Sequence, residues 1–245
     1  MRPLQTPNLP QKRVRAVVMQ PCAAADRLCG TGLTVLPPMP NITLHAETAC
    51  HADMLLCHAG GNVVFMEPAQ PLLAASLCAF GFDVRFSVPL GRAYPADVVL
   101  NVAVGKHFAL GNFRYADPGL RAFLEQSGKK LVSVRQGYAK CSLCFAAENA
   151  FITEDAGIAA ALEKIGADVL LISAGEVALS KAHTGFFGGA AGLIGPGTLA
   201  VNGRLDTHRD GGRIKAFLAK YGVRALELTD GKITDIGGIL PLTEE

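Results

Sequence analysis

The stretch Asp117–Val134, DPGLRAFLEQSGKKLVSV, contains the pattern that decides the fold. It opens with an aspartate that can cap a helix and a proline, the residue favoured in the first helical turn. Leu124 is followed four residues later by Gly128, and glycine readily takes the left-handed conformation that ends a helix. The apolar run Leu131–Val134 then has the character of a strand. The stretch therefore predicts a helix that ends at a glycine and leads into a strand.

The same pattern of leucine, three residues and glycine occurs five times, at intervals of roughly 50 residues, which marks an internal repeat. The pairs are Leu28/Gly32, Leu77/Gly81, Leu124/Gly128, Leu162/Gly166 and Leu218/Gly222. Strand-like runs follow the glycines at residues 33–36, 82–86, 131–134, 169–172 and 223–228. Other strand-like runs precede the helices at residues 16–19, 62–66, 107–111, 149–153 and 198–201. Each unit is thus expected to be a strand, a helix and a second strand.

A third strand is expected in each unit, beginning near Ala52, Ala96, Cys141, Gly189 and Ile233. The last of these, Ile233–Leu240, has no helix after it, and the first unit, which begins near Val14, lacks such a strand. We therefore expect the C-terminal strand to complete the first unit and to close a ring, since closure leaves few free sheet edges. The alternative is an open α/β sheet in which glycine merely follows each helix.

The composition limits the class of protein. Of the 245 residues, 50% are hydrophobic and 18% are charged, which excludes a disordered chain. A net charge of +2 does not favour binding to nucleic acid or to an anionic membrane, and no apolar run reaches the ~18 residues of a membrane helix. No signal peptide is visible, and the seven cysteines are an odd number. We expect a cytoplasmic protein without disulfides.

One local motif carries a resemblance. His51-Ala52-Asp53-Met54, followed by Asn62–Phe65, resembles the His-x-Asp segment of deiminases that act on guanidinium groups. Together with the five units, it makes the chain similar to the pentein, or guanidine-modifying, superfamily. That superfamily includes arginine deiminase, agmatine deiminase, dimethylarginine dimethylaminohydrolase, arginine:glycine amidinotransferase and a non-enzymatic ribosome anti-association factor.

The resemblance implies a fold and an activity. The fold would be a single α/β domain over residues 1–245, a five-bladed pseudo-symmetric α/β-propeller with strands around the axis and helices outside. The activity would be that of a cysteine-dependent hydrolase or transferase acting on a guanidinium or amidine group of a small molecule, with no cofactor and no metal.

The chain departs from the superfamily at its C-terminal end. Deiminases carry their nucleophilic cysteine in a glycine-rich segment there, but the corresponding Asp235–Pro241 contains none. Either activity is lost or the site lies in another unit. Cys141 is the candidate replacement, because it lies two units after His51, close to the separation in the smaller members. Lys140 can lower the pKa of the Cys141 thiol if the strand is broken there. The alternative is that Cys141 is a small buried apolar residue.

His51 is the candidate general acid and base, since its ordinary pKa suits both steps; the alternative is a surface or capping histidine. Asp53 and Glu148 are the candidate carboxylates for binding a guanidinium group. Asp97 and Asp235 occupy the same register as Asp53 in their own units, which favours a turn role for all three.

Two other functions stay open. One is a non-catalytic pentein that binds a protein or ribosomal partner, which the missing C-terminal cysteine favours. The other, less favoured, is a metal site in which Cys141 and Cys144 combine with Cys50/His51 or Cys57/His58. The sequence leaves the substrate and the oligomeric state undetermined.

Overall fold

The computed structural model describes all residues from 1 to 245 and contains five small sheets and six α-helices. The strands are β1 Arg2–Pro3, β2 Val14–Val18, β3 Thr34–Leu36, β4 Leu56–Gly60, β5 Val63–Met66, β6 Asp83–Phe86, β7 Ala103–Val104, β8 Phe108–Gly111, β9 Lys130–Ser133, β10 Cys144–Ala147, β11 Ala150–Thr153, β12 Asp168–Leu171, β13 Ala191–Gly195, β14 Thr198–Val201, β15 Arg224–Glu227 and β16 Leu240–Glu244. The α-helices are α1 Ala23–Cys29, α2 Ala52–Leu55, α3 Pro71–Ala79, α4 Pro118–Gln126, α5 Ala156–Glu163 and α6 Gly211–Lys220; one 3₁₀ turn, η1, spans Leu205–Thr207.

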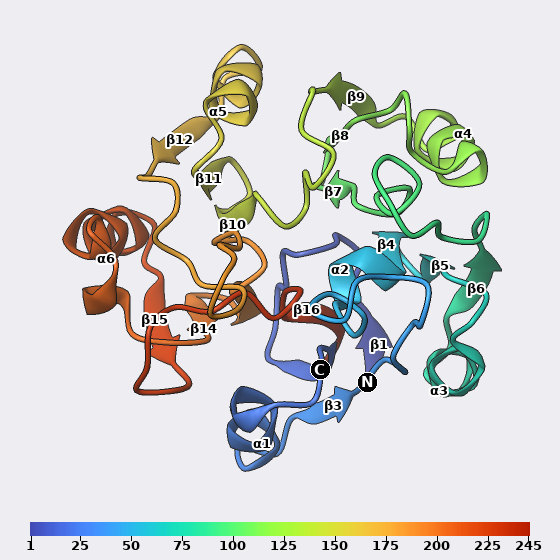
Figure 1. The fold of residues 1–245 in the computed structure, drawn as a ribbon, viewed down its shortest axis with the longest axis horizontal. Coiled ribbons are helices and arrows are strands. Elements are labelled where there is room, and N and C mark those ends of the chain that lie inside the picture. Colours follow the sequence, from blue (N-terminus) through green and yellow to red (C-terminus); the bar gives the residue numbers. More distant parts are fainter.

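Each sheet repeats one topology. In four sheets the first two strands pair antiparallel, and the third pairs parallel with the second after a helical crossover, as in β4-β5-α3-β6. In the four-stranded sheet, β16, β2 and β3 pair in this way, and β1 is added at the other edge of β16. A parallel pair needs such a crossover, whereas an antiparallel pair can be joined by a tight turn. In Figure 1 the sheets lie around the centre of the molecule, and α1, α3, α4, α5 and α6 lie at the periphery.

The predicted helix ends are confirmed. The five peripheral helices end two or three residues before Gly32, Gly81, Gly128, Gly166 and Gly222. The backbone φ angles of these glycines are 80°, 86°, 75°, 85° and 67°, respectively, in the left-handed region that favours glycine. The five repeat leucines are all 0–1% exposed, so each anchors its helix on the core.

Aspartate side chains lie at the starts of three helices, and the predicted cap at Asp117 is confirmed. Asp117 and Asp155 cap α4 and α5 by accepting hydrogen bonds from the backbone N–H groups of Leu120 and Ile158, both at 2.8 Å. Asp210, at the start of α6, instead accepts hydrogen bonds from Ser173 N–H and Arg213.

The C-terminal strand pairs with the N-terminal one, as predicted. β16 is antiparallel to β2, with Leu240 opposite Val18 and Glu244 opposite Val14, and β1 pairs on its other edge. The first sheet is therefore built from both ends of the chain. No helix is long and apolar enough to cross a lipid bilayer.

The third strand of each unit begins later than predicted, by two residues at β13 and by as many as seven at β7 and β16. The residues near Ala52, Ala96, Cys141, Gly189 and Ile233 form turns, and the strands begin farther along the chain, at β4, β7, β10, β13 and β16. Ala52, for example, begins the one-turn helix α2, because the His51 carbonyl accepts hydrogen bonds from Met54 and Leu55 N–H. Before β16, Gly237 and Gly238 have φ angles of 73° and 81°, which break the extended chain. We call the five segments that directly precede β4, β7, β10, β13 and β16 the inner turns.

Candidate active site

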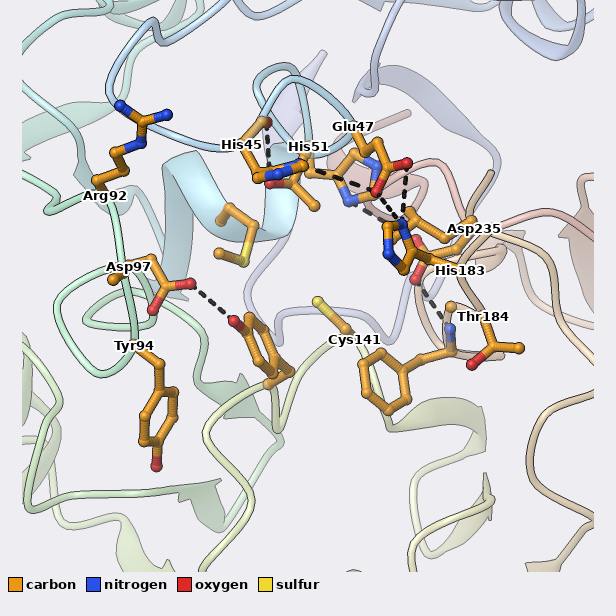
Figure 2. Close-up of a pocket in the computed structure, with 17 residues that line it drawn as sticks. His45, Glu47, His51, Arg92, Tyr94, Asp97, Cys141, His183, Thr184 and Asp235 are labelled. Carbon is orange, nitrogen blue, oxygen red and sulfur yellow. Dashed lines mark hydrogen bonds and ion pairs between the residues drawn. The ribbon is translucent and has the colours of Figure 1, made fainter. Parts of the chain in front are cut away.

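The inner turns converge on one cavity of about 430 Å³ (Figure 2). Among its lining residues are His51 from the turn before β4, Asp97 from that before β7, Cys141 from that before β10, Phe186 from that before β13 and Asp235 from that before β16. All five units therefore contribute to the same cavity. The two residues predicted to be catalytic, Cys141 and His51, both line it.

The Cys141 side chain is fixed by an asparagine. Cys141 is 3% exposed, and Figure 2 shows its sulfur directed into the cavity. The Nδ2 group of Asn101 donates a hydrogen bond to Sγ of Cys141 at 3.0 Å. No motif in the sequence marks Asn101; its only signal is a polar residue directly after the apolar run Val98–Leu100.

Burial raises the pKa of the Cys141 thiol well above its usual value, and the nearby carboxylates of Asp53 and Asp235 raise it further. The hydrogen bond from Asn101 acts in the opposite direction. The thiol of the free protein is therefore protonated, and a cation bound beside the carboxylates would oppose their effect on its pKa.

Lys140 does not have the predicted effect on Cys141. Its side chain lines a different, small hollow with Cys57 and His58, and its charge lowers the pKa of Cys57 and Cys144. Burial dominates for both thiols and raises their pKa to about 12. Lys140 and Cys141 lie in a turn before β10, and the Lys140 side chain lines the small hollow while the Cys141 side chain lines the main cavity.

His51 lies against Asp235 inside the protein. Nδ1 of His51 is 3.7 Å from Oδ1 of Asp235, and the two side chains are only 2% and 3% exposed. The His51 Nε2 atom is buried and makes no hydrogen bond, so it is free to exchange a proton with a ligand. His51 is therefore neither a surface histidine nor a side-chain helix cap.

The Asp235 carboxylate is held from two further directions. It accepts hydrogen bonds from Gly237 N–H and Phe186 N–H, both at 2.9 Å. Glycine at positions 185 and 189 leaves room for it, because a Cβ atom there would lie within 2.3 Å of Asp235 atoms. Burial raises the pKa of Asp235 to about 6, with the Asp53 charge adding to this and His51 opposing it.

Asp53 and Asp97 supply two more carboxylates. Asp53 is fully buried, and neither of its side-chain oxygens has a hydrogen-bond partner. Asp97 accepts a hydrogen bond from the Tyr138 hydroxyl at 2.7 Å, and its other oxygen is buried and unpartnered. Buried carboxylate oxygens without partners are uncommon and are well suited to a bound cation. Of the three aspartates in shared register, Asp97 and Asp235 line the cavity; Asp53, a predicted binding residue, does not line it, although its charge acts on the Cys141 thiol.

Glu148, the other predicted binding carboxylate, does not line the cavity. It lies in the turn between β10 and β11 and pairs with Lys106 at 2.9 Å on the surface. The predicted binding role of Glu148 is therefore wrong. The carboxylates that line the cavity are instead those of Asp97, Asp235 and Glu47.

Two loops meet at the mouth of the cavity. Glu47 and His183 form an ion pair at 2.9 Å, and His45 lies 3.9 Å from Glu47 (Figure 2). Tyr138 and Phe186 stack along one wall with ring centroids 6.1 Å apart. The cavity thus combines acidic groups with aromatic faces, both of which attract cations.

All seven cysteines are free thiols. No group of three or more histidine, cysteine, aspartate or glutamate side chains is arranged to hold a metal ion. Cys144 packs in the core with Phe145 and Phe151, away from His51.

A family described as "Family of unknown function (DUF6873)" matches residues 19–240. The chain belongs to this family. The match covers all five inner turns, so the candidate site lies wholly within the DUF6873 region. A comparison with curated protein sequences finds no match.

Solved structures similar to the DUF6873 chain have the pentein fold. A histidine-to-glycine variant of dimethylarginine dimethylaminohydrolase, as an adduct with S-methyl-L-thiocitrulline, matches with a TM-score of 0.58 and 11% identity, covering 94% of this chain and 100% of that one. Inosamine-phosphate amidinotransferase from Streptomyces griseus matches with a TM-score of 0.56 and 12% identity, covering 99% and 97%.

DDAH from Pseudomonas aeruginosa, a cysteine-to-serine variant in complex with citrulline, matches with a TM-score of 0.53 and 9% identity, covering 94% of this chain and 100% of that one. At these identities the likeness concerns the fold. The expected pentein relationship is confirmed at this level.

Proposed function

We propose that this protein is a cysteine-dependent hydrolase or transferase that acts on a guanidinium or amidine group of a small molecule. The observation that carries the proposal is that Cys141, His51 and two carboxylates line one cavity, with a third buried carboxylate close by. The pentein fold supports it, since the similar structures include enzymes named for action on methylated arginine and for amidino transfer.

The acidic groups would bind the planar cation. Asp97 and Asp235 bring two carboxylates to the cavity wall, and bidentate pairing of a guanidinium with a carboxylate is strong and directional. Asp53 is fully buried close by and adds its negative charge. Bound positive charge would offset the two carboxylates that raise the pKa of the Cys141 thiol. The substrate would thus promote ionisation of the nucleophile that attacks it.

The chemical steps then follow from the groups present. When the Cys141 thiol ionises, its proton passes to His51. The thiolate attacks the central carbon and forms a carbon–sulfur bond, and the carbon–nitrogen bond to the leaving amine breaks as protonated His51 donates its proton to that amine. In a hydrolase, neutral His51 then takes a proton from water, whose oxygen attacks the same carbon and releases the thiolate. In a transferase, a second amine takes the place of water.

We further propose that residues 1–245 form one domain with five units arranged as a five-bladed α/β-propeller. The repeated topology and the pairing of β16 with β2 support this arrangement. The cavity would then lie on the pseudo-symmetry axis. The inner turn that carries Cys141 would be equivalent to the inner turn of the C-terminal unit, where deiminases carry their cysteine.

The proposal is tested by labelling and turnover. A haloacetamidine, which carries the amidinium group and a leaving halide, should alkylate Cys141 faster than Cys144, although both residues are 3% exposed. Release of ammonia or amine from a panel of guanidino compounds should be abolished in Cys141→Ala. In His51→Ala the rate should fall by on the order of 10²–10⁴.

Cys144→Ala is the matched control, because it removes an equally buried thiol that does not line the cavity and should leave turnover unchanged. Equal labelling of Cys141 and Cys144, with no turnover in the panel, would contradict the proposal. The non-catalytic reading would then be favoured, since the Cys141 thiol is protonated in the free protein and no cysteine follows Cys144. That alternative is a non-catalytic pentein that binds a protein or ribosomal partner, so no guanidino compound should be consumed.

A further inference from the structure

The Asn101 side chain connects the two inner turns that carry the proposed catalytic residues. Its Oδ1 atom accepts hydrogen bonds from Lys140 N–H at 2.7 Å and from Cys141 N–H at 3.3 Å. Its Nδ2 atom donates to the Asp53 carbonyl oxygen at 3.0 Å and lies 3.4 Å from Sδ of Met54. The third contact of Nδ2 is Sγ of Cys141, at 3.0 Å. Asn101 is 1% exposed, so water does not compete for these contacts.

The partners of Asn101 determine the orientation of its amide group. Two backbone N–H groups require an acceptor on one side, and a backbone carbonyl requires a donor on the other. Reversing the amide would put oxygen against oxygen at Asp53 and NH₂ against N–H at Lys140. The group that faces the Cys141 sulfur is therefore an N–H donor.

A donor at this position affects the two forms of the thiol unequally. A hydrogen bond to an ionised acceptor is roughly twice as strong as one between neutral groups. The contact therefore favours the thiolate over the thiol, in an environment where burial and two carboxylates oppose ionisation. The Asn101 hydrogen bond acts in the direction of ionisation, against burial and the charges of Asp53 and Asp235.

We propose that Asn101 is a positioning residue that holds the Cys141 sulfur in place and stabilises it as the thiolate. This inference rests on the proposed role of Cys141 as the nucleophile. The bond to the Asp53 carbonyl adds a second effect, because it ties the turn of His51 and Asp53 to the turn of Cys141.

The experiment measures the reactivity of Cys141 without any substrate. The full chain is treated with iodoacetamide, a neutral reagent, at fixed mildly alkaline pH, and alkylation of each cysteine is followed by peptide mass spectrometry. Asn101→Leu removes the donor while keeping the volume similar. Loss of a hydrogen bond to a thiolate raises a thiol pKa by about one to two units, and greater nucleophilicity offsets part of the lost thiolate fraction. Alkylation of Cys141 should therefore slow by about threefold to tenfold.

A merely structural role predicts the opposite result, because a loosened site exposes Cys141 and speeds its alkylation. Asn202→Leu is the matched control: this buried asparagine donates to the Thr234 carbonyl oxygen at 2.9 Å and does not contact Cys141. It should lower the unfolding free energy without slowing Cys141.

Cys144 is the internal control in every sample, since it does not contact Asn101 and its rate should stay the same. If Asn101→Leu does not fold, Asn101→Ser is used, which is smaller and leaves room for water to take over the backbone contacts. Unchanged or faster alkylation of Cys141 in the folded variant would overturn the proposal. Because iodoacetamide is not a guanidino compound, a failure of turnover leaves this test valid.

Discussion

At the scale of single residues, Asp235 links the charge of the site to the stability of the fold. Its pKa is about 6 in the folded protein, compared with an ordinary value of 3.8. The folded state therefore binds this proton more tightly than the unfolded state does. The contribution of Asp235 to stability is highest below pH 4 and is lost as the pH rises through about 6.

The variant Asp235→Asn tests this linkage. Relative to the wild type, it should gain stability between pH 4 and pH 7 by on the order of 1–3 kcal/mol, since it has no buried charge to form. Urea unfolding at a series of pH values measures the difference. A difference that does not change with pH would contradict the assigned environment of Asp235. The same variant should lose turnover, because His51 loses its charged partner.

The predictability of each site residue depends on whether the sequence carries a pattern for it. His51 and Asp53 lie in a recognisable motif, and Cys141 follows from the spacing of the units. No motif marks Asn101, because its importance comes from five contacts with residues that are distant in sequence. The partners lie in two inner turns, and Asn101 itself lies in a third. The prediction for Glu148 failed because Cys141 precedes β10 and Glu148 follows it. The four residues of β10 span roughly 13 Å, so the two residues lie at opposite ends of the strand.

At the scale of elements, the glycines that end the helices allow a paired test. Gly222 follows α6 with a φ of 67°, and an added Cβ atom would meet nothing within 4 Å. Gly222→Ala should therefore lower the unfolding free energy by about 1–2 kcal/mol, purely through the left-handed backbone. Gly212 lies inside α6 and has equally open surroundings. Gly212→Ala should raise the unfolding free energy by about 0.5–1 kcal/mol.

The opposite signs of these two effects are the measurable result, and urea unfolding of both variants provides it. Two losses of equal size would mean that crowding, and not backbone conformation, decides the outcome. The same conformational preference made the helix ends predictable from the sequence. The strand starts were not predictable, because apolar residues in the inner turns are buried as deeply as those in strands; Ala52 and Leu100, for example, are 0% exposed.

At the scale of the whole molecule, the joining of both chain ends in one sheet predicts tolerance of circular permutation. Arg2 lies opposite Glu244 in the β1–β16 pair, so a short linker can connect the termini. A new start at Gly231, in the exposed turn after β15, would make β16, β1 and β2 continuous in sequence. This permutant should fold and should show wild-type alkylation of Cys141, since exposed loops and neighbouring termini tolerate such changes.

Circular dichroism and the iodoacetamide assay test the permutant. A chain cut at Gly231 without the linker, and without residues 231–245, is the comparison, and it should lose the folded site because β2 loses its partner. A permutant that is as disordered as this truncated chain would contradict the proposed ring.

The cavity draws a side chain from the inner turn of each of the five units, and this arrangement connects ligand occupancy with the internal motions of the protein. Local opening of any one unit removes one wall of the cavity, so no partly opened state can retain a ligand bound by all the walls. A ligand present at a hundred times its dissociation constant would therefore disfavour every such opening by about 2.7 kcal/mol. Amide hydrogen exchange should consequently slow together in all five sheets, although no strand residue lines the cavity.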